Sequence, residues 1–401
     1  MKSFASLTVR LTAIALLFAA PAVAQSGSPE IDELHRRVAI IRSQLPQITA
    51  LANKYAKFLG RDGSGRFLIS RRIDPAFFLE FTNRAGGPPD TQDADNPGVA
   101  GLALLPVRHW TGNGLGIASK VEELRSQARP VLIIGPAAGR PESLLGGTPF
   151  IDNGAPNGDR ANASINGIAN MIAAWTLYCE VVSAATRDGW QPGVLLSVLM
   201  PGATRHNARA TFRMPGVTPE PIPDGSLGAQ YLDAIDAILT QAAAPAHVTL
   251  IDTVAARLRA LRDAGATLYA ASCGHYLLEE IPRDAMSSRT LSVIPVAGSA
   301  AAPGASPSKR GDVMLWFGYG GYDCPNADVS RSFQDLGLKV VLASDHPPAS
   351  PPANVIGQIL LPWQLPDGIV SLPFAPARMA PVSSVDMALH YIWLRRLLTT
   401  P

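Results

Sequence analysis

Glutamates and histidines close to glycine-containing turns are the residues of this sequence best suited to exchange protons. Four of them are candidates for general acid–base chemistry: Glu80, His206, His275 and Glu280. Each also has an ordinary structural alternative. Glu80 is spaced to pair with Arg84 one helical turn later, and a loop histidine commonly bonds backbone carbonyls or fixes a turn. The residue types alone leave both roles open.

The other reactive side chains fit no metal or nucleophile motif. Three cysteines, Cys179, Cys273 and Cys324, allow either one disulfide and one thiol or three thiols. The motifs CxxC, HExxH and GxSxG are absent from the sequence. His390 stands among apolar residues and is expected in the core. We therefore expect neither a bound metal nor a cofactor.

Apolar periodicity indicates the elements that position these residues. Short apolar runs predict strands at 66–70, 131–134, 267–271, 313–317 and 339–343. Helical spacing predicts helices at 30–59, 77–82, 164–185, 228–264 and 383–398, with breaks near Pro46 and Pro245. Strands that alternate with helices indicate parallel α/β units, in which the loops at strand ends are the expected ligand sites.

The amino terminus has the features of an export signal. Lys2 and Arg10 precede an apolar run at 11–20, which is too short to span a bilayer, and Ala22-Val23-Ala24 offers small residues for cleavage. We predict that residues 1–24 are a signal peptide and that the protein is periplasmic or secreted. No later stretch has about 18 unbroken apolar residues, so no membrane span is expected in the mature chain.

Composition restricts the remaining classes of function. The chain has 401 residues, of which 47% are hydrophobic and 16% charged, so a largely disordered chain is excluded and about two domains are expected. The 34 basic and 32 acidic residues become equal in number once Lys2 and Arg10 are removed with the leader. This balance argues against a nucleic-acid partner.

Three motifs of the first half resemble the sugar isomerase (SIS) domain family, in a phosphosugar-isomerase-like branch. Residues 80–87, EFTNRAGG, resemble the E-x-x-x-R-A-G-G that ends a family helix. Residues 152–156 match the branch's D-N-G-A-P, and residues 197–209 resemble its S-A-N-V-D-G-G-D-E-H-N-x-R segment. The three motifs occur in the family's order.

The second half resembles the same family again. Residues 273–276, CGHY, and the acidic residues after them are similar to the family's G-H-S loop and its helix. Residues 311–315 match the G-D-V-L-I strand, and residues 381–385 match the P-V-S-S/T-V that opens the last helix. The resemblance implies SIS-like domains at 30–214 and 228–401, with a linker at 215–227. Each is expected to be a flavodoxin-like αβα domain of three layers with a parallel sheet, and the two to form an intrachain pseudo-dimer. Because SIS modules commonly dimerise, a homo-oligomer is a further expectation.

The resemblance also implies where a ligand would bind. Family phosphate loops read S-x-S-G, and the second half has Gly318, Tyr319, Gly320 and Gly321 at these positions. In the first half we match the loop at 136–139, which Arg140 follows. Both loops lack the hydroxyls that hold an anion together with backbone N–H groups, which argues against a tightly bound phosphosugar.

Residues of the other matched motifs complete the expected site. Arg84, Asn153 and Ser384 are taken as ligand-binding residues with the loop residues above. Glu80, and either Glu279 or Glu280, stand where some family members place their acid–base glutamate. His275 follows a glycine-loop strand, and either His206 or His390 is a candidate to face a shared interface.

Three readings of function follow from these residues. The first is an exported tandem SIS protein that binds a sugar or a carbohydrate derivative, with catalysis lost. The second is an active sugar or amino-sugar isomerase, or an etherase-like lyase, that uses Glu and His for acid–base chemistry. The third is an interaction module that uses the fold only as a pairing surface, and it predicts no pocket at the carboxyl ends of the strands.

Overall fold

The computed structural model describes most of the chain beyond the predicted leader. The described residues are 27–57, 66–82, 84–89, 91–96, 98–110, 114–141, 147–157, 162–197, 202–208, 213, 216–288, 291–293, 308–319, 333–363, 368–375 and 378–399. The predicted signal peptide, Cys324, Gly320 and Gly321 lie outside these residues.

The first half of the chain builds a five-stranded parallel sheet with the strand order β2-β1-β3-β4-β5. Its strands are β1 (Phe67–Ile69), β2 (Thr91–Asp93), β3 (Leu102–Pro106), β4 (Val131–Gly135) and β5 (Phe150–Asp152). Its helices are α1 (Pro29–Ser43), α2 (Leu45–Ala56), α3 (Pro75–Phe81), α4 (Gly114–Ser126), α5 (Ala163–Arg187) and the short α6 (Ala203–Asn207).

The second half builds another five-stranded parallel sheet, with the order β10-β9-β8-β6-β7. Its strands are β6 (Leu268–Ser272), β7 (Ser292–Val293), β8 (Val313–Gly318), β9 (Lys339–Ser344) and β10 (Val355–Leu360). Its helices are α7 (Ser226–Ala242), α8 (Pro245–Asp263), α9 (His275–Ser288) and α11 (Ser383–Thr399). An antiparallel hairpin of β11 (Gly368–Ser371) and β12 (Arg378–Pro381) precedes α11.

The two sheets have the same topology. If the strands of each sheet are numbered from its own first strand, both read 2-1-3-4-5, an order typical of flavodoxin-like folds. The predicted α/β class with two tandem parallel sheets is therefore confirmed. The shared order also pairs β8 with β3 and β9 with β4. The loop after β3 is thus the counterpart of the segment that starts at Gly318, and not the loop after β4, where the sequence analysis placed it.

Each sheet divides its side chains between two cores, because successive residues of a strand point to opposite faces. Leu102, Leu104 and their neighbours on one face join a large central core that also contains the corresponding face of the second sheet. The opposite face of the first sheet packs against α4 in a smaller cluster that includes Ala103 and Leu105. The outer face of the second sheet has its own cluster, which includes Trp316. The two halves therefore share one continuous hydrophobic interior.

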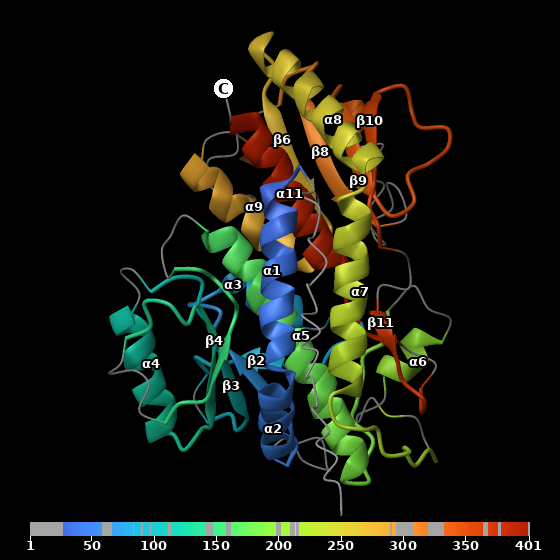
Figure 1. Ribbon diagram of the computed structural model, residues 1–401. Coiled ribbons are helices and arrows are strands. Elements are labelled where there is room, and N and C mark those ends of the chain that lie inside the picture. Colours follow the sequence, from blue (N-terminus) through green and yellow to red (C-terminus); the bar gives the residue numbers. More distant parts are fainter. Residues whose placement is uncertain are drawn as a thin grey trace, which may run out of the picture.

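The long helices α1, α5 and α7 run side by side through the middle of the molecule (Figure 1). α5 packs against α2, α7 and α1, and every residue from Asn166 to Thr186 is buried. By length and composition α5 is apolar enough to cross a membrane, but its complete burial fits the core helix of this fold instead. Its apolar composition on all sides follows from that position.

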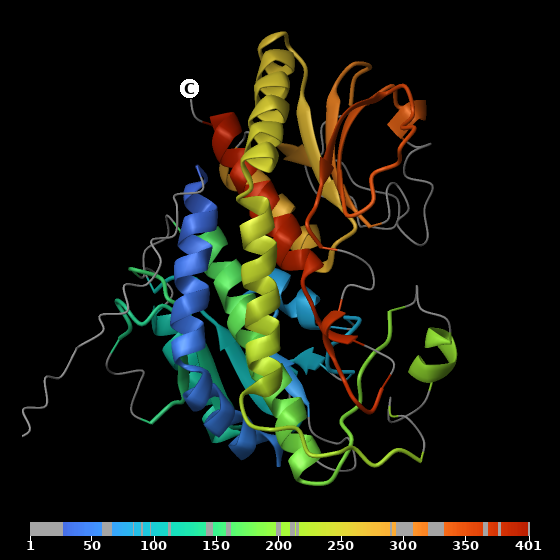
Figure 2. The same cartoon turned by 45° about the vertical axis from the view of Figure 1, so that its right-hand side comes forward.

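Prolines set two of the helix boundaries. α1 and α2 meet at Gln44, with Pro46 in the first turn of α2, close to the predicted break. α7 and α8 meet before Pro245 and form a bend of 62°. Figure 2 shows α7 lying along α1 and α5, while α8 rises beside the second sheet. The joint between α7 and α8 is therefore where the chain passes from one half to the other.

Candidate functional site

Five of the residues predicted for the site come together where the two halves meet, at the carboxyl ends of β6 and β8. Glu80 ends α3, and Arg84 follows it, both on the side of the first half. His275 begins α9, directly after β6, and Tyr319 follows β8. Ser384 lies in the first turn of α11, next to Ser383. We refer to these six residues, Glu80, Arg84, His275, Tyr319, Ser383 and Ser384, as the interface cluster.

Arg84 is the centre of the interface cluster. Its side chain is only 4% exposed, and it donates hydrogen bonds to Tyr319 Oη at 3.0 Å and to Ser383 Oγ at 2.5 Å. The Tyr319 and Ser383 hydroxyls are themselves 3.0 Å apart. Arg84 Nε lies 3.5 Å from Glu80 Oε1, so the ion pair expected from the i, i+4 spacing is formed. The guanidinium is therefore held by groups from both halves.

Glu80 is completely buried and accepts a hydrogen bond from Ser384 Oγ at 2.6 Å. The turn at Gly86 brings these two residues together. Gly86 has φ of +78°, and a Cβ there would stand 3.1 Å from the backbone of Met379 in β12. A residue without a side chain is needed at this close approach. β12 then leads directly into the serines of α11.

His275 is tied to the end of α3 by a contact with the backbone of Leu79, the residue before Glu80. Its Nδ1 lies 3.2 Å from the carbonyl oxygen of Leu79. Since a carbonyl only accepts, Nδ1 carries the hydrogen and Nε2 keeps its lone pair. Burial, together with the Arg84 cation, lowers the pKa of His275 to about 4. The imidazole is therefore neutral at pH 7 and available as a base or acceptor.

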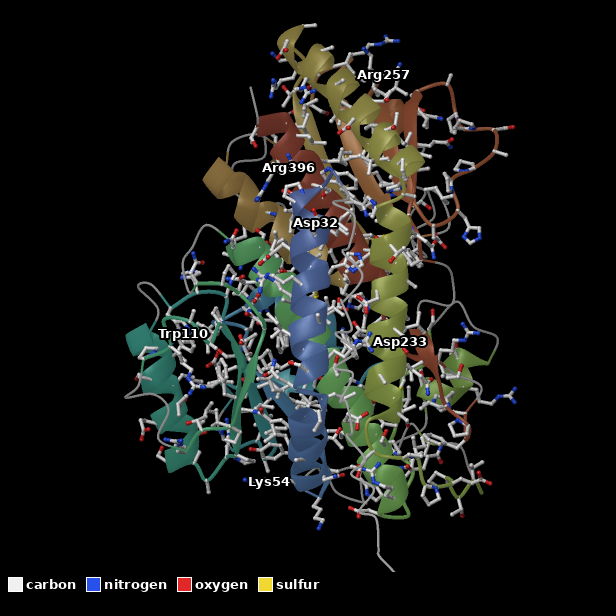
Figure 3. The ribbon with its side chains drawn as sticks, viewed as in Figure 1. Asp32, Lys54, Trp110, Asp233, Arg257 and Arg396 are labelled. Carbon is white, nitrogen blue, oxygen red and sulfur yellow. The ribbon has the colours of Figure 1, made fainter. Side chains whose placement is uncertain are left out.

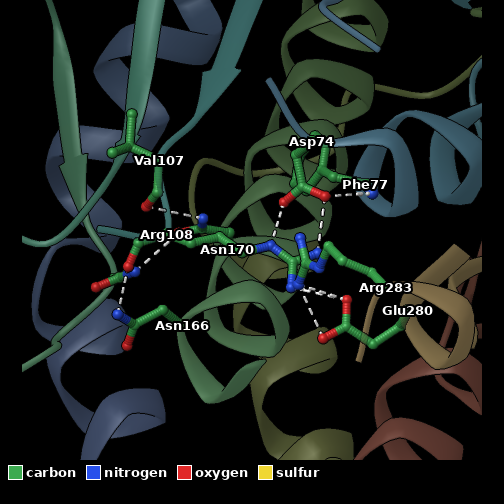
Figure 4. A network of polar contacts seen from close by, with 9 residues as sticks. Asp74, Phe77, Val107, Arg108, Asn166, Asn170, Glu280 and Arg283 are labelled. Atoms are coloured by element: carbon green, nitrogen blue, oxygen red, sulfur yellow. Dashed lines mark hydrogen bonds and ion pairs between the residues drawn. The ribbon is translucent and has the colours of Figure 1, made fainter. Parts of the chain in front are cut away.

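Glu280 belongs to a neighbouring buried network that also spans the two halves (Figure 4). Arg108 follows β3 and donates to both carboxylate oxygens of Asp74, the N-cap of α3, at 2.5 and 2.7 Å. The same guanidinium donates to Glu280 Oε2 at 2.8 Å, and Arg283 contacts both Glu280 oxygens at 2.9 and 2.7 Å. Two arginines thus occupy the carboxylate that was predicted to act as an acid or base.

The charges in this network stabilise one another. Burial opposes ionisation of Asp74, but the adjacent Arg108 guanidinium outweighs it and lowers the pKa of that carboxyl. Burial likewise opposes the charge on Arg108, and Asp74 and Glu280 together raise its pKa. The Arg108 guanidinium also lies over the ring of Tyr276, 5.3 Å from its centroid. The network therefore joins the two halves through buried charged contacts. We refer to Asp74, Arg108, Glu280 and Arg283 as the polar lock.

The remaining predicted residues lie elsewhere and have local structural contacts. His206 Nε2 is 2.9 Å from the carbonyl oxygen of Val194, in α6, which Figure 1 shows away from α9. Asn153 bonds Asn170 and the backbone N–H of Ala155, so it fixes the turn after β5. Arg140 follows β4 and lies over the ring of Phe150, 4.4 Å from its centroid. Their ligand-binding roles stay predictions.

A cavity of 380 Å³ opens at the carboxyl ends of β1 and β2 in the first sheet. We refer to it as the β1–β2 cavity. The cavity lies between the loops after these two strands and the helix α4, and most of its lining side chains are polar. The lining residues are Ser70, Arg72, Ile73, Asp95, Gly116, Ile117, Ser119, Lys120 and Glu123. Ligands of parallel α/β sheets bind at this edge.

The charged side chains that line the β1–β2 cavity are two cations, Arg72 and Lys120, and two carboxylates, Asp95 and Glu123. Lys120 Nζ lies between Asp95 Oδ1 at 2.6 Å and Glu123 Oε1 at 2.8 Å. Burial opposes ionisation of Asp95, but the bond from Lys120 outweighs it and lowers the pKa of that carboxyl. Ser70 Oγ donates to Asp95 Oδ2 at 2.9 Å. Arg72 is exposed and, within the described residues, has no ion-pair partner, so it is the cation left for a ligand.

Comparison with solved structures finds chains of similar fold at low identity. A candidate phosphosugar isomerase from Silicibacter pomeroyi is 12% identical, with a TM-score of 0.48 over 92% of this chain and 96% of its own. A candidate sugar-binding protein from Salmonella typhimurium is 11% identical, with a TM-score of 0.47 over 92% and 98%. The C-terminal domain of glucosamine-fructose-6-phosphate aminotransferase from Francisella tularensis is 10% identical, with a TM-score of 0.45 over 94% and 96%.

No protein-family model matches the sequence, and no curated protein matches it significantly.

Sequence reasoning missed the β1–β2 cavity and the role of Arg108. The run LALLP of β3 was not recognised as a strand, so the side chains that follow it were not considered. β2, with the polar sequence TQD, was not among the predicted strands either. One signal was present, because Ser70 ends the predicted strand at 66–70 and Arg72 follows it, so both stand at its carboxyl end, where ligands are expected.

Proposed function

We propose that the protein binds a sugar or a related hydroxylated carbohydrate derivative in the β1–β2 cavity. The cavity itself carries the proposal, because its volume of 380 Å³ lies within the range of small-molecule pockets. Its place at the strand ends argues against the reading in which the fold is only a pairing surface.

The lining suits a ligand rich in hydroxyls. Carboxylates such as Asp95 and Glu123 accept hydrogen bonds from sugar hydroxyls, and Ser70 and Ser119 both donate and accept. The paired charges leave no strong positive field, which disfavours a phosphate as the main anchor. Arg72 can bind one oxygen-rich group at the rim of the cavity.

Binding to the β1–β2 cavity can be tested by calorimetry with a panel of neutral hexoses, amino sugars, amino-sugar acids and hexose phosphates. We expect Arg72→Gln to weaken the best ligand at least about tenfold, because a charged hydrogen bond contributes about 1.5–3 kcal/mol. Arg71→Gln is the matched control, since Arg71 is the exposed neighbour whose partner is Glu279. The control should change affinity less than about twofold. Millimolar or absent binding across the panel contradicts the proposal.

A second candidate function, acid–base catalysis on a sugar, is favoured by the contact that ties His275 to the carbonyl of Leu79, the residue before Glu80. A neutral imidazole whose Nε2 keeps its lone pair and a carboxylate in the same cluster are the kinds of group that a proton transfer next to a carbonyl needs.

Solvent-deuterium uptake into candidate sugars tests this second function. If it is correct, wild-type protein labels one of the sugars, and His275→Gln slows labelling by about a hundredfold or more. His35→Gln, a substitution in the His35–Asp236 pair of α1 and α7, should leave the rate unchanged. If wild-type protein labels none of the sugars, the protein is not an isomerase of them, and binding remains as the function.

A further inference from the structure

Three titratable side chains form a line between α11 and α8, away from both candidate sites. Asp386 and His390 lie one turn apart on α11, and both are completely buried. His390 Nδ1 is 3.2 Å from Asp386 Oδ1, and His390 Nε2 is 2.7 Å from His247 Nε2. His247 belongs to the first turn of α8 and is partly exposed. The sequence predicted that His390 is a core histidine or faces a shared interface.

The surroundings of the Asp386 carboxylate indicate which of the neighbouring side chains carries a positive charge. In the described part of the chain its oxygens have no hydrogen-bond partner, and its one ion-pair contact is His390. A buried carboxylate needs a cation beside it. Burial opposes the charge on His390, but Asp386 outweighs burial and raises the pKa of the imidazole. His390 Nδ1 also lies 2.8 Å from the backbone carbonyl oxygen of Asp386, so Nδ1 carries a hydrogen. Of the two imidazoles, His390 is thus the one that favours the proton, and in its protonated state the Nε2–H donates to His247.

His247 must then be neutral, because two ring nitrogens 2.7 Å apart need one hydrogen and one lone pair between them. Burial, together with the His390 cation, lowers the pKa of His247 from 6.5 to about 4. Its position in the first turn of α8 acts in the same direction, since the amino end of a helix disfavours positive charge.

The other charged groups on the elements around this line are engaged elsewhere. Among the described residues, the ion pairs of the two imidazoles are limited to Asp386. Arg396 of α11, which is labelled in Figure 3, pairs with Glu30 of α1, and Asp236 of α7 pairs with Arg42 and His35. Glu180 of α5 accepts from Thr49, and Glu280 of α9 is bound by Arg108 and Arg283. His275 of α9 contacts the carbonyl of Leu79, and Arg259 and Arg262 of α8 donate to carbonyls of α11. Titration of the contact therefore depends on the two imidazoles, His247 and His390.

We propose that the His247–His390 contact is an acid-sensitive joint that holds the first turn of α8 on α11. The His247–His390 contact lies just after the 62° bend between α7 and α8, where the chain leaves the first half (Figure 2). Its other side is α11, which packs on elements of both halves. A proton on His247 replaces its lone pair with an N–H that faces the N–H of His390, and two cations then meet. The contact opens, and the amino end of α8 separates from α11.

The sign of the pH dependence follows from the two states of His247. Between pH 6.5 and about 4 the unfolded or opened chain binds a proton at His247 that the closed joint does not bind. The contribution of His247 to the stability of the closed joint is therefore full above pH 6.5 and falls as the pH decreases toward 4. The contribution of His390, whose pKa is raised, has the opposite sign: it is full below pH 6.5 and is lost as the pH rises through the pKa of His390. The carbonyl contacts of Arg259 and Arg262 near the other end of α8 contain no group that titrates in this range, so opening is confined to the amino end of α8.

Hydrogen exchange and histidine NMR on the full chain test this proposal. We expect the His247 ring to titrate near pH 4, and exchange at residues 245–250, corrected for its intrinsic pH dependence, to rise at least about tenfold between pH 6.5 and 4. In His247→Gln, whose neutral amide oxygen still accepts from His390, the rise should be less than about twofold. His35→Gln, the control at the α1–α7 pair, should behave as wild type.

Three results would each overturn the proposal. They are a His247 ring that titrates near 6.5, wild-type exchange at 245–250 that does not change with pH, and an unchanged acid response in His247→Gln. The NMR titration needs only wild-type protein, with the variant used to assign the signal, so the test does not depend on the stability of any one variant.

Discussion

Arg108→Met is expected to lower the free energy of unfolding by about 3–5 kcal/mol. Arg108 is the cation that both Asp74 and Glu280 contact, and the side chains of all three residues are at most 6% exposed. In the variant Glu280 keeps its ion pair with Arg283. Among the described hydrogen bonds of Asp74, only the one from the backbone N–H of Phe77 remains. An uncompensated buried carboxylate is the physical cause of the loss. Urea unfolding followed by circular dichroism measures it.

Two companion variants separate charge from packing. Asp74→Asn in the Arg108→Met background removes the unpaired charge and should recover part of the lost stability. Arg42→Met is the matched control, because Arg42 also contacts two carboxylates, Asp233 and Asp236, but is 34% exposed. Its expected cost is below about 1 kcal/mol. Similar costs for the two arginine variants would contradict the buried-lock interpretation.

Gly167→Ala is expected to destabilise the protein by about 1–3 kcal/mol, although alanine is normally the better helix former. Gly167 lies inside α5, where an added Cβ would meet Tyr276 Oη at 2.2 Å and Arg108 Cζ at 2.8 Å. The added methyl group therefore disturbs the lock between the halves. Urea unfolding again provides the measurement.

The cause of this cost can be checked by removing the atom that the methyl group meets. Tyr276 Oη has no hydrogen-bond partner in the described structure, so Tyr276→Phe should cost little and should reduce the cost of Gly167→Ala when the two are combined. Gly116→Ala is the control in α4, where a Cβ would meet nothing within 4 Å. It should stabilise the chain by about 0.5–1 kcal/mol. Additive effects of Gly167→Ala and Tyr276→Phe would contradict the proposed contact.

The lock and the two candidate sites suggest how the fold relates to function. The interface cluster and the Asp74–Arg108–Glu280 network both cross between the halves, whereas the β1–β2 cavity belongs to the first half alone. A ligand in the cavity can therefore bind without separating the halves. Chemistry at His275 would instead require both halves in place, because Glu80 and His275 come from different halves.

Local patterns predicted much of this architecture. The apolar runs that became β1, β4, β6, β8 and β9 are long enough to be recognised without tertiary information. The breaks between the paired helices were visible from prolines, whose missing N–H prevents continuation of a helix. β2 and β7 could not be recognised in this way, because the three residues of β2, TQD, are polar and β7 has only two residues, so neither forms an apolar run. Whether residues 1–24 are removed on export stays a prediction.

The sequence by itself determined the α/β class, the duplication and the grouping of Glu80, Arg84, His275, Tyr319 and Ser384 as site candidates, since these follow from local periodicity and motif order. Only the tertiary structure decided which candidates meet. Glu80 and Ser384 are 304 positions apart in the chain, yet a single hydrogen bond of 2.6 Å joins them. Glu280 lies outside that group, because its carboxylate is bound by two arginines, Arg108 and Arg283. Partners so distant along the chain are set by how the two sheets pack, which no local pattern records.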